Sequence, residues 1–255
     1  PAQYWTMLRM KFLQLPRDIK EAAVDAIDEI EGKTNVRFYN SLKDEEYYEP
    51  GHIKLPNIAV RMNGTAVEGS GSYGLVGGEQ YINVPETLSK STHDEMKRFF
   101  MHAFCNAAGM FNEQQRKDRD DYVVVYLNNV KDNCKAAFTK ITKNYTMHGA
   151  FDMSSITLAA SKDYSKNGQN TIVKKGNYKI PINSTLSAGD ISFLNSFYLP
   201  YIARTDNYIE LGDTYYPNGQ KLTESERLEL QNQLNAQRGL YGTPPIENRK
   251  EELDW

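Results

Sequence analysis

The sequence predicts a mixed fold of the α+β class, with strands and helices in the first half and mainly loops in the second. Apolar residues alternate loosely over residues 4–13, which is typical of a strand. They recur at helical spacing over residues 16–32 and 94–109, whereas residues 149–200 show mostly loops and short elements. Of the 255 residues, 40% are hydrophobic, which is enough for a sizeable core.

The first elements follow one another as strand, helix and two short strands. After the strand over residues 4–13, Pro16 begins a helix and Gly32 ends it, since proline suits the first turn and glycine the position after the last. Residues 36–39 and 58–62 are short runs rich in β-branched and aromatic or apolar side chains. We therefore expect strands there, separated by a polar loop.

A glycine-rich stretch over residues 69–78 precedes a predicted strand at 80–84. It is not a phosphate-binding loop, because no Lys-Ser or Lys-Thr follows the glycines and no helix begins directly after them. A glycine-rich edge strand or hairpin is favoured instead. The most regular helical pattern covers residues 94–109, and a shorter helix is expected around 190–198.

Residues 202–255 differ in composition from the preceding chain, and we expect them to form a C-terminal extension. Pro-Asn-Gly at 217–219 is typical of a hairpin turn. Thr223 and Glu226 fit a capping box at the beginning of a helix over about 223–238.

Composition excludes some classes of function. Thirty Lys and Arg against 33 Asp and Glu leave a net charge of −3, without the basic excess that nucleic-acid binding needs. No apolar run approaches the roughly 20 residues that span a bilayer, and the first residues do not have the pattern of a signal peptide. Cys105 and Cys134 allow one disulfide at most. The sequence does not fix the oligomeric state or the compartment.

The most informative stretch runs from His102 to Asp120 and reads HAFCNAAGMFNEQQRKDRD. It resembles the signature of the astacin family of zinc endopeptidases in the metzincin clan, HExxHxxGxxHE followed by Q-x-R-x-D-R-D. Seven residues are in register with that signature: Gly109, Glu113, Gln114, Arg116, Asp118, Arg119 and Asp120.

Other segments extend the resemblance over residues 4–201. Residues 34–38 are similar to the family's T-C-I-R-F strand, residues 72–78 to its glycine-rich edge strand, and residues 151–159 to its Y-D-x-x-S-I-M-H-Y turn. The resemblance implies a two-lobed domain over residues 1–201. A twisted mixed sheet and long helices would lie above a cleft, with an irregular lobe below it.

The departures from the family pattern concern its catalytic site. His102 remains, but Asn106 and Asn112 occupy the positions of the other two zinc-binding histidines, and a neutral amide is a poor zinc ligand. Ala103 replaces the general-base Glu, so no carboxylate is placed to accept a proton. The Met beneath the metal and the metal-proximal Tyr correspond to Thr157 and Ala159.

These replacements predict a pseudo-peptidase, with no catalytic residue and no bound metal or other cofactor. We expect it to bind an extended peptide or a protein in the cleft, along an edge strand formed by Ser72, Tyr73, Gly74, Leu75 and Val76. One alternative is an active zinc metalloendopeptidase, or another hydrolase, with a non-standard ligand set around His102. In a further alternative, residues 202–255 dock on a partner or on the domain itself.

The charged residues after the motif are interpreted as structural. The resemblance implies that Glu113 corresponds to a Glu that reaches toward the mature N-terminus. It implies that Arg116, Asp118 and Asp120 correspond to residues that brace the loop leaving the active-site helix. The disulfide cysteines of the family are missing, with Asn35 at one such position and Pro200 near another. The resemblance alone suggests a secreted or periplasmic protein, and no signal peptide is present in this chain.

Overall fold

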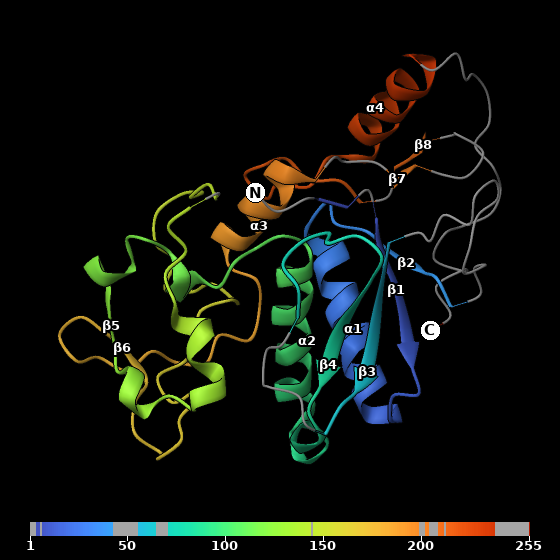
Figure 1. Cartoon of the computed structure of the whole chain (residues 1–255). Helices are drawn as coiled ribbons and strands as arrows, with labels where there is room; N and C mark the ends of the chain where they lie inside the picture. The colour runs from blue at the N-terminus through green and yellow to red at the C-terminus, as the bar shows by residue number, and fades with distance from the viewer. Residues whose placement is uncertain are drawn as a thin grey trace.

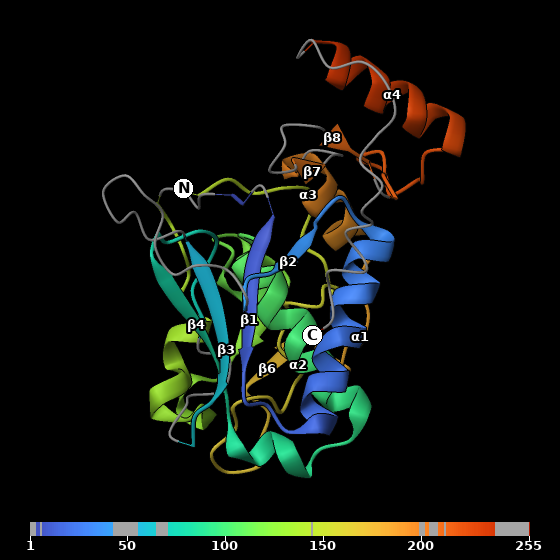
Figure 2. The ribbon, with the colours of Figure 1, turned by 90° about the vertical axis from the view of Figure 1, so that its right-hand side faces the viewer.

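A four-stranded parallel sheet with two helices on one face forms the larger lobe (Figures 1 and 2). The structure is a computed structural model that describes residues 4–5, 7–42, 56–64, 71–143, 145–198, 202–203, 209–211, 213–237 and 255. The strands lie in the order β2-β1-β3-β4, and all three pairings are parallel. Their bounds are β1 Leu8–Leu13, β2 Phe38–Asn40, β3 Asn57–Met62 and β4 Glu79–Val84.

The two helices bury their apolar faces against this sheet. In β1, Leu8, Met10 and Phe12 alternate with less buried residues, so one side of the strand faces the core. Helix α1 (Arg17–Lys33) follows directly and covers that side together with α2 (His93–Ala107). The predicted order of strand, helix, two strands, strand and long helix is confirmed.

Helix α2 carries the residues of the predicted site, and both of its ends are defined by local interactions. Thr92 and Glu95 form a reciprocal capping box at its beginning. At its end Gly109 adopts a φ of 108°, which a residue with a side chain rarely adopts. This turn lets the Met110 N–H donate to the Cys105 carbonyl at 3.0 Å. The chain therefore reverses directly after the helix and returns toward it.

The smaller lobe has a core of its own and little regular structure. Strands β5 (Val123–Val125) and β6 (Ile172–Lys174) pair antiparallel, and residues including Phe138, Leu158 and Ile180 pack beneath them. Five short 3-10 helices connect the described elements: η1 Glu86–Lys90, η2 Glu113–Gln115, η3 Arg119–Asp121, η4 Leu127–Asn129 and η5 Asp132–Phe138. The predicted α+β, two-lobed architecture is confirmed, with the irregular lobe separated from the sheet by α2 (Figure 1).

The last described elements follow α3 (Ala188–Phe197), which has its own capping box at Ser187 and Asp190. They are β7 (Ile202–Ala203), β8 (Ile209–Glu210) and α4 (Glu224–Gln237). The hairpin turn is also present, because Tyr215 and Lys221 pair antiparallel around Gly219 with its φ of 84°. Pro200 lies outside the described residues.

The glycine-rich segment differs from the predicted edge strand. Among its described residues, Gly71 forms an isolated antiparallel bridge with Ile82 of β4 and Leu75 is a further isolated bridge residue, but no continuous strand runs over residues 72–76. Gly74 has a φ of 66°, which breaks an extended run. The Gln80 side chain donates to the Gly74 carbonyl at 2.9 Å and accepts from the Val76 N–H at 3.1 Å. An amide side chain thus satisfies main-chain groups that a neighbouring strand would otherwise bind.

No helix among the described residues is long and apolar enough to cross a membrane. Cys105 and Cys134 are free and buried in the cores of different lobes, so they do not form a disulfide with each other.

Asn35, at a position where the family has a cysteine, joins three parts of the chain through hydrogen bonds. Its amide donates to the carbonyls of Tyr198 and Tyr215, both at 3.2 Å, and accepts from the Tyr215 N–H at 2.9 Å. Its own N–H donates to the Asn195 side chain at 2.7 Å. Because Asn35 is buried, these bonds fix Tyr198 and Tyr215 to the larger lobe.

Replacing Asn35 by Ala should lower the free energy of unfolding by about 2–4 kcal/mol, because it leaves several buried main-chain groups of Tyr198 and Tyr215 without partners. Urea denaturation followed by circular dichroism measures the change. Asn232→Ala in α4 is a matched control, since Asn232 is exposed and its replacement should be neutral or slightly stabilising. Equal stability of the two variants would contradict the role assigned to Asn35.

Candidate functional site

The structure brings the three positions of the expected zinc ligands together, and their side chains bind one another. His102 Nε2 lies 2.6 Å from Asn112 Oδ1. Asn106 Nδ2 donates to the same oxygen at 3.1 Å and to the Met110 carbonyl at 2.9 Å. Helix α2 supplies His102 and Asn106, and the chain reversal at Gly109 returns Asn112 to their side.

The hydrogen bonds continue from Asn112 into both lobes. Asn112 Nδ2 donates to the Tyr73 hydroxyl at 3.1 Å, and this hydroxyl donates to Gln115 Oε1 at 2.9 Å. Gln115 Nε2 donates to the carbonyls of Ala136 and Thr139 at 3.1 and 3.4 Å. We call this series, from His102 through Asn112 and Tyr73 to Gln115, the polar chain.

The direction of every hydrogen bond in the polar chain follows from its Gln115 end. Main-chain carbonyls only accept, so the Gln115 NH₂ must face Ala136 and Thr139, and Gln115 Oε1 faces Tyr73. The Tyr73 hydroxyl then donates to Gln115 and accepts from Asn112, which turns Asn112 Oδ1 toward Asn106 and His102. His102 Nε2 therefore carries a hydrogen.

His102 is neutral in this arrangement. Burial lowers the pKa of its imidazole, because the charged form loses solvation, and the bond to Asn112 offsets this only in part. A neutral imidazole with hydrogen on Nε2 has its lone pair on Nδ1. The nitrogen that faces Asn106 and Asn112 thus offers no electron pair to a metal ion.

The side chains present do not fit the zinc ion that the fold implies. Two of the three ligand positions supply amides that already bind each other, and His102 directs an N–H group toward them. Ala103, at the general-base position, cannot accept a proton. Within the ranges that the structure describes, no three His, Cys, Asp or Glu side chains are grouped so that they could hold a metal. Cys105, considered with His102 as a half-site, is buried in the main core.

The floor of the site is polar and fully bonded where the family has its Met. Thr157 is buried, and its hydroxyl accepts from the Glu113 N–H at 3.1 Å. It lies 2.9 Å from the Ser155 hydroxyl, which donates to Asp190 at 2.6 Å. The Ala159 N–H donates to the Gln114 side chain at 3.1 Å. The residues at both corresponding positions thus hold the loop beneath α2 through hydrogen bonds.

The charged residues after the helix hold loops together. Arg116 forms two 3.0 Å bonds to Asp118 and donates to the carbonyls of residues 148–150. Asp120 pairs with Lys140 at 2.5 Å. Glu113 accepts from the Asp152 N–H at 2.7 Å, yet burial raises its pKa to about 7. These contacts favour a structural role.

A hollow of about 320 Å³ opens beside Ala103 and His102, between α2, η1 and the smaller lobe. We call it the Ala103 hollow. Twelve residues line it: Pro85, Thr87, Leu88, Ser91, Glu95, Arg98, Phe99, His102, Ala103, Asn106, Asp163 and Tyr164.

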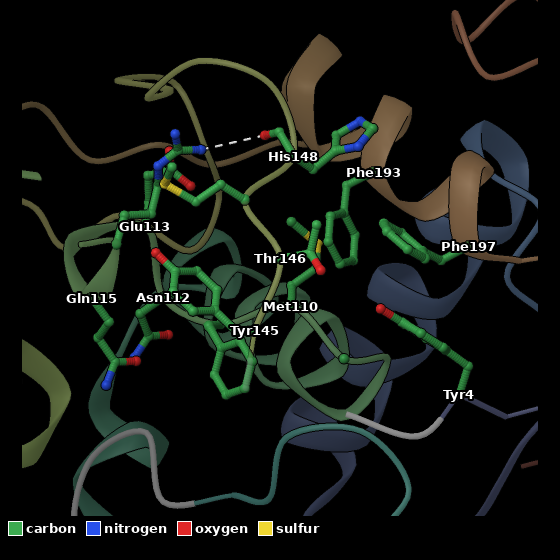
Figure 3. A pocket seen from close by; sticks show the side chains of 14 residues that line it. Tyr4, Met110, Asn112, Glu113, Gln115, Tyr145, Thr146, His148, Phe193 and Phe197 are labelled. Atoms are coloured by element: carbon green, nitrogen blue, oxygen red, sulfur yellow. Dashed lines mark hydrogen bonds and ion pairs between the residues drawn. The ribbon is translucent and has the colours of Figure 1, made fainter. Parts of the chain in front are cut away.

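A second pocket, rich in aromatic side chains, reaches Asn112 from the end of α2 (Figure 3). Tyr145 lies beside Asn112, whereas Tyr4, Phe193 and Phe197 form the opposite part of the wall. The Tyr4 and Phe197 rings stack with centroids 5.0 Å apart. The dashed line marks the bond from Arg116 to the carbonyl of His148. Sequence reasoning did not predict this pocket.

A model of the peptidase family described as Astacin matches residues 2–199. The chain belongs to the astacin family. The match covers both lobes, including residues 103, 106 and 112.

Curated relatives include two named zinc metalloproteinases of Caenorhabditis elegans, nas-13, 32% identical over 49% of this chain, and nas-15, 30% identical over 42%. Flavastacin of Elizabethkingia meningoseptica is 26% identical over 69%. The aligned parts are 27%, 19% and 35% of those three proteins, respectively.

Solved structures show the same fold. High choriolytic enzyme 1 from Oryzias latipes, described as a hatching enzyme zinc-protease, superposes with a TM-score of 0.59 at 23% identity, covering 76% of this chain and 94% of that one. Myroilysin superposes with a TM-score of 0.53 at 19% identity, covering 76% and 95%.

Tyr73→Phe tests the polar chain. The substitution removes one hydroxyl and leaves Asn112 Nδ2 and Gln115 Oε1 without their partner, so the free energy of unfolding should fall by about 1–2 kcal/mol. Urea denaturation measures the loss. Tyr178→Phe is the control, because Tyr178 is 66% exposed and should tolerate the change. If Tyr73→Phe were as stable as the unaltered protein, the polar chain would not support the fold.

The raised pKa of Glu113 predicts a pH dependence of stability. The pKa of Glu113 in the folded protein is about 7, above the usual 4.5. The contribution of Glu113 to the free energy of unfolding is therefore fully present below about pH 4.5 and is lost as pH rises through 7. Over this pH range the free energy of unfolding should fall by about 3 kcal/mol. Glu113→Gln should remove that part of the dependence in urea denaturation at pH 4.5, 6 and 8. Glu229→Gln, at an exposed position, should leave the profile unchanged; an unaltered profile for Glu113→Gln would refute the assignment.

Proposed function

We propose that this astacin domain binds extended peptide or protein segments in its cleft without hydrolysing them. The observation that carries the proposal is the bond between His102 Nε2 and Asn112, whose direction places an N–H group where a metal ligand is needed. Ala103 adds a second reason, since hydrolysis also needs a group that accepts a proton from water. A cleft between two lobes can still bind a peptide without metal.

The segment Ser72–Val76 remains the proposed edge of the binding cleft, but its contacts should differ from those of an open strand. Gln80 already binds main-chain groups of Gly74 and Val76, and the Gly74 N–H donates to the Asn106 carbonyl at 2.9 Å. A bound peptide would therefore meet side chains, such as the 62% exposed Val76, more than a complete hydrogen-bond ladder.

The remaining parts of the chain are assigned by the same proposal. Residues 1–201 would form the peptidase-like domain and residues 202–255 an extension docked on it, as the bonds from Asn35 to Tyr215 and from Asn195 to Tyr216 suggest. Secretion or export to the periplasm is proposed from family membership.

Zinc content is the direct test. Protein purified without chelator should contain less than about a tenth of an equivalent of zinc by mass spectrometry, because amides bind zinc poorly. It should also leave fluorogenic peptides uncut, while titration with extended peptides shows binding. A full equivalent of zinc with peptide cleavage would instead support a metalloendopeptidase with a non-standard ligand set around His102. Absence of binding across a peptide library would refute the binding function.

A variant with Asn106→His and Asn112→His is the positive control. The side chains at 102, 106 and 112 already converge, so three imidazoles there should bind about one equivalent of zinc. Adding Ala103→Glu should supply the missing proton acceptor. If the double variant folds but binds no zinc, the backbone as well as the side chains has departed from a metal-binding geometry.

A further inference from the structure

We infer that the Ala103 hollow is a subsite for the side chain of a tyrosine in the bound peptide, that is, for a neutral aromatic ring carrying one hydrogen-bond donor. The inference rests on the proposed binding function and names the ligand chemistry of the same cleft. Three properties of the hollow support it: its volume, the charges of the side chains that line it, and the hydrogen-bond acceptor that His102 Nδ1 supplies.

The size and walls of the hollow suit one aromatic ring. Its volume of about 320 Å³ exceeds the roughly 150 Å³ of an apolar cavity that holds benzene. Phe99, Leu88 and the Tyr164 ring supply apolar surface, and the Ala103 methyl leaves the space in front of α2 open. Tyr164 has a φ of 61°, an unfavourable conformation for a residue with a side chain that is often found at binding sites.

Of the three charged side chains that line the hollow, Arg98 and Asp163 are paired with each other, and Glu95 takes part in a capping box. Arg98 forms a 3.0 Å ion pair with Asp163 and donates to the Asn183 carbonyl at 2.9 Å. Glu95 accepts from the Thr92 N–H at 2.8 Å within the capping box. An anionic ligand would lose its hydration and gain no free counter-charge, because Arg98 is already paired and Glu95 is itself anionic. The hollow therefore favours a neutral ligand over an anionic one.

His102 supplies one hydrogen-bond acceptor. Because Nε2 donates to Asn112, the lone pair lies on Nδ1, and no residue in the described part of the chain binds that nitrogen. His102 also lines the hollow. An aromatic ligand that places an O–H at Nδ1 would satisfy this acceptor, whereas a phenyl ring would leave it desolvated. Tyrosine combines both requirements, and the indole N–H of tryptophan is its nearest competitor.

Isothermal titration with three blocked peptides, identical except for a central Tyr, Phe or Trp, tests the subsite on the full chain. The Tyr peptide should bind about fivefold tighter than the Phe peptide, as expected for one added hydrogen bond, and tighter than the Trp peptide. The ¹⁵N resonance of His102 Nδ1, assigned by comparison with His102→Gln, should shift with the Tyr peptide alone. The sequence has only four histidines, which makes this assignment practicable.

Ala103→Leu fills the hollow and should weaken binding of the Tyr peptide at least about tenfold, removing its preference over Phe. Ala188→Leu is the matched control, since Ala188 is exposed and does not line the hollow. Circular dichroism shows whether Ala103→Leu folds. If it does not, the His102 Nδ1 resonance of the unaltered protein still decides the question.

The outcomes separate this inference from the function on which it rests. Equal binding of the three peptides with an unmoved Nδ1 resonance would overturn the subsite and leave peptide binding intact. A preference for Trp would overturn the phenol assignment. Binding of none of the three, while other extended peptides bind, would also refute the subsite, whereas failure of every peptide would refute both proposals.

Discussion

The arrangement of the site depends on the hydrogen bonds by which the Gln115 amide donates to the carbonyls of Ala136 and Thr139. Because those acceptors cannot be reversed, they set the orientation of Tyr73 and Asn112, and finally the position of the hydrogen on His102. A loop of the smaller lobe thereby determines which nitrogen of an imidazole on α2 is available. The chemistry of the cleft follows from that choice.

Hydrogen bonds and an ion pair join α2 to the smaller lobe. Arg98 reaches Asp163 and the Asn183 carbonyl, and the Asn183 amide donates to the carbonyls of Met153 and Ser155 at 3.1 and 3.0 Å. Asp190 on α3 accepts from the Ile156 N–H at 2.8 Å. These bonds fix the loop over residues 153–157 from two sides, and the Arg98–Asp163 pair joins two residues that line the Ala103 hollow.

Local patterns in the sequence predicted the elements well. Some features depend only on residues a few positions apart, so they can be predicted from a single sequence. They are the apolar stripe and the C-terminal glycine of α2, the capping box at Thr223 and Glu226, and the turn at residues 217–219. The predicted edge strand at residues 72–76 is not a continuous strand in the structure. Gln80 binds its main-chain groups through a side-chain contact, which the local sequence does not indicate. The polar chain was missed for the same reason: Tyr73 and Gln115 are 42 positions apart, and neither residue type indicates the other.

The amides at positions 106 and 112 also explain how the fold can persist without the metal. A metal ion that binds the folded state adds its binding free energy to the stability of the protein. Loss of the ion alone would remove that free energy and leave the imidazoles without partners. An amide has both a donor and an acceptor. Asn106 donates to Asn112 and to the Met110 carbonyl, and Asn112 accepts from Asn106 and donates to Tyr73. Hydrogen bonds within the protein thus offset the free-energy cost of removing these amides from water. The hydrogen bonds of two amides and a tyrosine hydroxyl, contributed by different segments, join these segments at the site.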